Sequence, residues 1–302
     1  MNTLKDSFLK YLSLKKSGSA DTKKAYNHDL SLFIKFLEDR DINDFKNVDK
    51  IVILDYLSDL KKGNLTNSKI SEATYARNLS CLKSFFKYLN TNMNFPDNPC
   101  INIKVSSIKK ALPNFLTIGE VERLLESCDL SNEIGIRNRM IIELLYATGM
   151  RVSELSNIKL IDIDTNSLLI KVTGKGNKER LVPYYDYLNN LLVLYLKEYR
   201  NKHLKNDCDF LFINQKGNQL STRSVEIIVN KQSKEAGLQN RVYPHMLRHS
   251  FATHILDNGA NLRVVQELLG HENLSTTTIY THVTVDKLQE VISKKHPHSN
   301  KK

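Results

Sequence analysis

Apolar residues recur at helical spacing in four segments of the first hundred residues, at about 4–16, 22–39, 48–61 and 72–90. In the second segment Tyr26, Leu30, Phe33 and Leu37 share one face, because residues three or four apart lie on the same side of a helix. Turn signals at Gly18-Ser19 and at 62–64 separate the segments. The pattern predicts a four-helix domain over residues 1–100 whose aromatic side chains form its core.

This helical pattern stops at two prolines, Pro96 and Pro99. Proline disfavours the helix interior and restricts the residue before it. Residues 101–116 then show no clean period and include Lys104, Lys109 and Lys110. We expect an extended basic linker there, between two domains.

Residues 117–302 mix helical segments with short strands. Thr117 and Glu120 have the spacing of a capping box at a helix start. The expected helices are 118–127, 134–148, a short one from Ser153, 186–200, one from Ser221 to Gly237, and a helical closing region. The expected strands are 168–172 and 180–183, which form a hairpin around a glycine-rich turn, and 210–213. The predicted fold is mainly α with a small antiparallel β-sheet, in two domains, and residues 294–302 are expected to form a polar tail.

Composition and charge narrow the function classes. The formal net charge is +11, and residues 1–110 alone hold 19 Lys+Arg against 12 Asp+Glu, or +7. A basic excess spread through periodic sequence favours a polyanionic partner. No apolar run has the length of a membrane span, and no signal peptide is apparent. Four cysteines lie far apart without metal-site spacing, which suits a reducing compartment. We therefore expect a cytoplasmic, nucleoid-associated protein without a membrane partner.

Several polar residues have types and spacings suited to phosphate chemistry. His245 and Arg248 lie three apart after Pro244, which favours a helix start. Arg151 and Glu154 have the same spacing, and Glu154 is placed to orient Arg151. Arginine grips phosphate bidentately and stays charged. The alternatives are a capping histidine beside a surface arginine, and an ordinary surface ion pair.

Lys175 lies in the glycine-rich hairpin turn, where a flexible lysine can reach a leaving oxygen, although most hairpin lysines only keep a turn soluble. Metal and nucleotide sites are not predicted. His245 and His249 have zincin spacing but enclose no glutamate. Asp162 and Asp164 lie in an expected turn, where aspartate is common. The glycine-rich turn lacks the pattern of a P-loop. No cofactor is expected.

Four ordered stretches carry a resemblance to a known family. They are Leu-Leu-Tyr-Ala-Thr-Gly-Met-Arg-Val-Ser-Glu-Leu at 144–155, Gly-Lys-Gly-Asn-Lys-Glu-Arg-Leu-Val-Pro at 174–183, His-Met-Leu-Arg-His-Ser-Phe-Ala-Thr-His at 245–254, and Leu-Leu-Gly-His-Glu-Asn-Leu-Ser-Thr-Thr-Thr-Ile-Tyr-Thr-His-Val at 268–283. The chain resembles the tyrosine recombinases, also called the phage integrase family, and within them the Xer-type site-specific recombinases. The helical domain fits the core-binding (SAM-like) domain of this family in length.

The resemblance implies a catalytic set, namely Arg151, Lys175, His245, Arg248, His271 and Tyr280. It implies that Tyr280 attacks a DNA phosphate, leaving a 3′-phosphotyrosyl bond and a free 5′-hydroxyl. Arg151, Arg248 and His271 would bind the phosphate, Lys175 would protonate the leaving oxygen, and His245 would assist proton transfer at the tyrosine. Neither ATP nor metal would be needed, because the covalent bond stores the energy of the cleaved link.

The resemblance also implies partners. Strand exchange would pass through a Holliday junction in a homo- or hetero-tetramer on two double-stranded DNA sites. A second recombinase or an activator protein is a possible further partner. Apolar spacing at Val285, Leu288 and Ile292 predicts a terminal helix, which in the family docks on a neighbouring protomer. The alternative is a helix packed on its own domain.

Three functions follow as hypotheses: resolution of chromosome or plasmid dimers, integration or transposition of a small mobile element, and non-catalytic DNA binding. The few residues before the first helix favour dimer resolution over integration, since integrases commonly carry an additional arm-binding domain.

Overall fold

The computed structural model describes residues 1–14, 20–66, 68–95, 97–103, 115–174, 178–205, 207–270 and 284–299. Contacts divide the chain into two compact units, Met1–Lys110 and Ala111–Lys302. Cys100 and Ile103 are buried in the first unit, and Leu116 is buried in the second. Among the described residues, no helix is both long enough and apolar enough to cross a bilayer.

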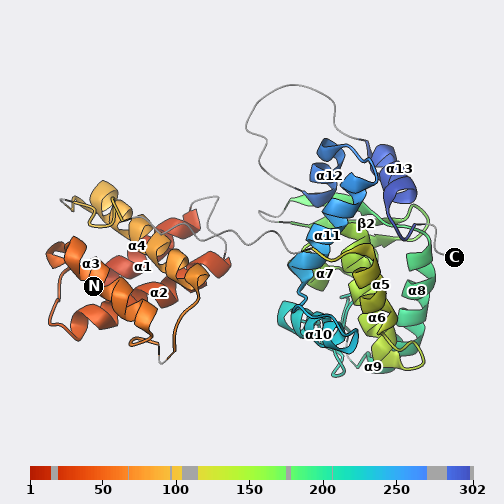
Figure 1. Cartoon of the computed structure of the whole chain (residues 1–302), viewed down its shortest axis with the longest axis horizontal. Helices are drawn as coiled ribbons and strands as arrows, with labels where there is room; N and C mark the ends of the chain where they lie inside the picture. The colour runs from red at the N-terminus through yellow and green to blue at the C-terminus, as the bar shows by residue number, and fades with distance from the viewer. Residues whose placement is uncertain are drawn as a thin grey trace. The chain divides into compact units, whose positions relative to one another are not determined.

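The first unit is helical, as predicted, and is coloured red to orange in Figure 1. Its elements are α1 (Asn2–Leu14), α2 (Ala20–Glu38), a 3-10 turn η1 (Phe45–Asn47), α3 (Lys50–Lys62) and α4 (Glu72–Met93). The helix starts follow from local chemistry: the side chains of Asp49 and Ser71 accept hydrogen bonds from the backbone N–H groups of Val52 and Thr74. The core is aromatic, with Phe33 and Phe85 fully buried. The prediction that these rings form the core is confirmed.

The second unit is mainly helical and carries one small antiparallel sheet, which confirms the predicted fold class. Its principal helices are α5 (Ile118–Glu126), α6 (Glu133–Thr148), α7 (Val152–Asn157), α8 (Tyr187–Tyr195), α10 (Thr222–Glu235), α11 (Pro244–Asp257), α12 (Leu262–Leu269) and α13 (Val285–Lys295). Shorter pieces are a 3-10 turn η2 (Leu160–Asp162), a π-helical turn η4 (Leu196–Arg200) and α9 (Asn201–His203).

The sheet has the order β1-β2-β3, with β1 at Ile163–Asp164, β2 at Leu169–Thr173 and β3 at Glu179–Pro183. The β2–β3 hairpin confirms the sequence prediction, and its register pairs Val172 with Arg180. The strand β1 was not predicted. The expected strand at 210–213 is wrong, because only isolated bridges form at Phe210 and Ile213. The Arg200 side chain instead holds the Phe210 carbonyl there.

Helix α6 runs through the middle of this unit, with α8 on one side and α11 on the other (Figure 1). Almost every residue from Gly135 to Thr148 is buried, as expected of a helix that other helices surround. It ends at Gly149, which has a left-handed φ of 60°. A Cβ at this position would lie 2.4 Å from Cδ1 of Phe251. The chain therefore turns toward α7 at a point where only glycine fits.

We expect Gly149→Ala to lower the free energy of unfolding by about 2–4 kcal/mol, the sum of a strained φ and an overpacked ring contact. Gly237→Ala is the matched control, because Gly237 has a φ of 66° and nothing within 4 Å of its would-be Cβ. It should cost only about 1 kcal/mol. Urea unfolding of both variants measures the difference, and equal losses would contradict the packing argument.

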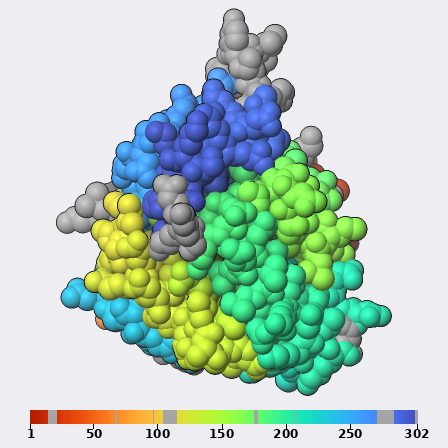
Figure 2. Space-filling view, turned by 90° about the vertical axis from the view of Figure 1, so that its right-hand side faces the viewer, coloured from red at the N-terminus to blue at the C-terminus, as the bar shows by residue number. Residues whose placement is uncertain are grey.

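The terminal helix α13 packs on its own unit, as the alternative reading stated. Leu288 and Ile292 are buried in the core of this unit, and the helix lies against β3 and α12. In Figure 2 its dark blue surface borders lighter blue and green surfaces of the same unit. Asn258 donates a hydrogen bond to the carbonyl of Lys295, at 2.8 Å. Docking on a neighbouring protomer stays a prediction.

The polar tail at 294–302 is partly buried where it is described, because His296 and His298 lie inside the unit. Nδ1 of His298 lies 2.8 Å from Oε1 of Glu143, a buried carboxylate on α6. The backbone N–H of His298 donates to Nδ1 of His296, at 3.1 Å, and Nε2 of His296 lies 3.3 Å from the Tyr146 carbonyl. Nδ1 of His298 and Nε2 of His296 thus meet partners that are far away in sequence, whereas Nε2 of His298 is buried without a hydrogen-bond partner among the described residues.

This cluster predicts a loss of stability in acid. Burial, with the nearby His298, lowers the pKa of His296 from 6.5 to about 3. Burial alone would raise the pKa of Glu143, but its hydrogen bond from His298 and the charges of His298 and Arg139 bring it down to about 2. The unfolded chain therefore binds more protons below pH 6.5. The free energy of unfolding should fall as the pH drops, by about 1 kcal/mol per pH unit and group, first for His296 and below pH 4.5 also for Glu143.

Thermal unfolding between pH 7.5 and 4.5 measures this slope. His296→Phe removes one titrating ring and should reduce the slope above pH 4.5 by the contribution of that group. Equal slopes in the variant and the wild-type chain would contradict the assignment to His296.

Candidate active site

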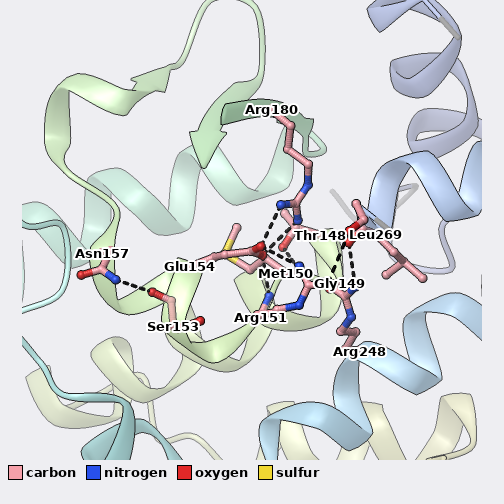
Figure 3. Close-up of polar contacts among 11 residues, drawn as sticks. Thr148, Gly149, Met150, Arg151, Ser153, Glu154, Asn157, Arg180, Arg248 and Leu269 are labelled. Carbon is pink, nitrogen blue, oxygen red and sulfur yellow. Dashed lines mark hydrogen bonds and ion pairs between the residues drawn. The ribbon is translucent and has the colours of Figure 1, made fainter. Parts of the chain in front are cut away.

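Arg248 lies on the second turn of α11, which begins at Pro244 as predicted. The residue is only 6% exposed. Nη1 donates to the carbonyl of Gly149 and Nη2 to that of Leu269, both at 2.6 Å (Figure 3). Burial, together with the nearby charge of Arg151, lowers the pKa of Arg248 to about 10. The guanidinium still carries its charge at neutral pH, and its two bonds leave other N–H donors for a ligand.

Arg151 is the residue before α7, directly after the turn that Gly149 makes. Its side chain is 35% exposed. Nη1 donates to Oε1 of Glu154 at 3.0 Å, and the backbone N–H donates to Oε2 at 2.8 Å. Nη2 lies 3.4 Å from the carbonyl oxygen of Gly270. Arg151 is thus held on one side by a carboxylate and open to solvent on the other.

Glu154 is the centre of this arrangement, with a side chain only 1% exposed (Figure 3). Burial alone would raise its pKa, but hydrogen bonds from Arg180 and Arg151 lower the pKa below the ordinary value. The carboxylate therefore stays charged at neutral pH. The predicted spacing of Arg151 and Glu154 corresponds to a real contact in the structure.

Arg180 on β3 was not singled out from the sequence. Its two terminal nitrogens donate to the two oxygens of Glu154, at 2.8 and 2.9 Å. One signal was available in the hairpin: Arg180 alternates with Val182, which places both on the inward face of β3. An inward-facing arginine is costly without an anionic partner. An arginine with this pattern, on a strand near predicted phosphate ligands, is therefore a candidate site residue from the sequence alone.

His245 lines a pocket together with Arg151, Arg248 and Pro244, with a volume of about 180 Å³. Partial burial of the ring and the charges of Arg248 and Arg151 lower the pKa of His245. Its imidazole is therefore neutral at neutral pH and able to accept a proton. Two guanidinium groups and one neutral imidazole around a small pocket suit an anionic ligand with a proton to give up.

Lys175, His271 and Tyr280, the other members of the predicted set, lie outside the described residues. The residues before two of them are described. A Cβ on Gly174 would lie 3.4 Å from Oε1 of Glu154, and the Gly270 carbonyl is within reach of Arg151. The chain therefore enters the first of these segments beside the Glu154 carboxylate and the second beside the Arg151 and Arg180 guanidinium groups.

Comparison with known proteins places the chain in a family. The model of the phage integrase family matches residues 114–287, and that of the phage integrase N-terminal SAM-like domain matches residues 6–92. The chain is 40% identical over 298 residues to tyrosine recombinase XerC of Oceanobacillus iheyensis, which covers 98% of this chain and 96% of that one. It is 39% identical over 300 residues to tyrosine recombinase XerD of Listeria innocua, with 98% and 99% covered.

A solved structure agrees with this match. The crystal structure of XerH site-specific recombinase bound to difH substrate, a pre-cleavage complex, has a TM-score of 0.67 at 30% identity and covers 96% of this chain and 84% of that chain. Because the family model spans more than half of the chain and these relatives cover nearly all of it, the chain belongs to the phage integrase family of tyrosine recombinases.

Proposed function

We propose that the protein is a site-specific DNA recombinase that cleaves and rejoins DNA through a tyrosine–phosphate bond. The observation that carries the proposal is the pocket where Arg151, Arg248 and His245 meet. Guanidinium groups offset the charge of a phosphodiester and of its transition state. The neutral His245 supplies a proton acceptor beside them. The names of the XerC, XerD and XerH relatives support the same activity.

The proposed reaction exchanges one phosphate ester bond for another, so it needs neither metal nor ATP. The oxygen of Tyr280 attacks the phosphorus as its proton passes to His245, and the bond from phosphorus to the 5′-oxygen breaks. Lys175 protonates that oxygen, and Arg151, Arg248 and His271 hold the non-bridging oxygens. A 3′-phosphotyrosyl bond and a 5′-hydroxyl remain, and attack by a 5′-hydroxyl reverses the step. Tyrosine needs this assistance because its ordinary pKa is about 10.

Within this activity we assign the protein to resolution of chromosome or plasmid dimers, in the cytoplasm. The similarity to XerC and XerD relatives supports this assignment. The acting form would be a tetramer on two DNA sites that resolves a Holliday junction, with α13 docking on a neighbour. The identity to the XerC relative, 40%, and to the XerD relative, 39%, is nearly equal. Action by this recombinase alone and action together with a second recombinase both agree with these values.

Covalent capture tests the proposal. The full chain is incubated with genomic DNA fragments, denatured, and recovered with any strand that stays attached. Sequencing of the attached strands should return a short, defined site, with the protein at a 3′ phosphate. No attachment, or attachment at random sequences, would overturn the assignment as a site-specific recombinase.

A further inference from the structure

Arg180 makes two short hydrogen bonds to the carboxylate that holds Arg151. Its side chain is 18% exposed, and its two terminal nitrogens form a fork on the two oxygens of Glu154 (Figure 3). We propose that Arg180 is a positioning residue, which acts through Glu154 to keep the Arg151 guanidinium directed at the scissile phosphate. This inference rests on the proposed function.

The argument starts from the number of donors on one carboxylate. Glu154 accepts four hydrogen bonds: two from the Arg180 fork, one from Nη1 of Arg151 and one from the Arg151 backbone. A carboxylate offers about four acceptor positions, so Glu154 is saturated. The fork-on-carboxylate geometry is the strongest pairing available to either arginine. Because Arg180 occupies it, Arg151 contributes only one side-chain N–H.

The consequence is that Arg151 keeps most of its charge for a ligand. If Arg180 were absent, the fork geometry on Glu154 would be open, and Arg151 could form a two-bond pair with it. The guanidinium would then turn from the pocket and be neutralised by Glu154. With Arg180 present, the guanidinium groups of Arg151 and Arg180 share the Glu154 carboxylate, and the Arg248 guanidinium lies nearby, so positive charge exceeds negative charge around the pocket.

The surrounding backbone fits this arrangement. A Cβ on Gly270, which has a φ of 64°, would lie 3.1 Å from Cζ and Nε of Arg180. The Gly270 backbone thus covers the Arg180 guanidinium, while its carbonyl oxygen lies 3.4 Å from Nη2 of Arg151. On β3, Arg180 is paired with Val172 in the hairpin ladder. Arg180 is therefore fixed from both sides, as a residue that holds another one in place must be.

The test compares Arg180→Gln with Arg137→Gln. Arg137 is a half-buried arginine of the same unit that donates to the Tyr199 hydroxyl at 3.1 Å. The substrate is the captured genomic fragment, remade as a nicked duplex so that attachment cannot reverse. The rate of covalent attachment should fall about 10²-fold in Arg180→Gln, the effect of a misplaced catalytic group, while the Kd for DNA changes less than about threefold. Arg137→Gln should attach at the wild-type rate.

A double-variant cycle separates positioning from mere stabilisation. Glu154→Gln removes the charge that would draw Arg151 away, so Glu154→Gln/Arg180→Gln should attach within about threefold of the rate of Glu154→Gln alone. Losses that multiply would show that Arg180 acts by another route and would overturn the inference. Should Arg180→Gln fail to fold, Arg180→Lys keeps the charge but not the fork and should lose about tenfold.

The wild-type chain is measured in each series, so that failure of the Arg180 role and failure of the proposed function give different results. Attachment at the wild-type rate by both Arg180 variants would overturn the role of Arg180 alone. No attachment by the wild-type chain would overturn the proposed function and this inference with it.

Discussion

Replacing Tyr280 with phenylalanine should abolish covalent attachment to DNA and leave DNA binding within about twofold of the wild-type Kd. Phenylalanine keeps the ring but lacks the oxygen that forms the bond to phosphorus in the proposed mechanism. Removal of a nucleophile lowers the rate by a factor on the order of 10⁵ or more. Binding depends instead on phosphate contacts from basic side chains. The two measurements are denaturing gel analysis of attached strands and a gel-shift titration.

Tyr243→Phe is the matched control. Tyr243 is 45% exposed and comes two residues before His245. Among the tyrosines that the structure describes, it is therefore the nearest in sequence to a residue of the site. This variant should attach DNA at the wild-type rate. Attachment by Tyr280→Phe would exclude Tyr280 as the nucleophile. Loss of attachment in Tyr243→Phe would contradict the assignment by showing that attachment needs the Tyr243 hydroxyl.

Arg248→Lys should lower the rate of attachment by about 10²- to 10³-fold, the range found for loss of one preorganised donor. It should also lower the free energy of unfolding by about 1–3 kcal/mol. The guanidinium bridges the carbonyls of Gly149 and Leu269, and one ammonium cannot reach both in the same geometry. A buried carbonyl would then lose its partner.

Arg151→Lys provides the comparison, because Arg151 is partly exposed and bridges no pair of buried carbonyls. It should lose attachment to a similar degree with much less effect on stability. Single-turnover rates and urea unfolding of both variants test this split. Full stability of Arg248→Lys, or equal destabilisation by both variants, would contradict the account of how Arg248 is held.

Much of the fold follows from local sequence. The four helices of the first unit come from apolar spacing and from short-range caps such as Ser71 on Thr74. The capping box of Thr117 and Glu120 starts α5 as predicted. The β2–β3 hairpin follows from alternation around a glycine-rich turn. Interactions over three or four residues decide these features, so they are visible in the chain itself.

The site divides in the same way. The sequence by itself determined that His245 and Arg248 share a helix and that Glu154 follows Arg151 at contact spacing, and its motifs identified the family. Only the tertiary structure showed that Arg180, 26 residues from Glu154, completes the carboxylate, and that His298, 155 residues from Glu143, is buried against it. Burying a charged or polar side chain is favourable only when a partner meets it. That partner comes from a distant part of the chain, so the local pattern does not identify it and only the fold brings the two side chains together.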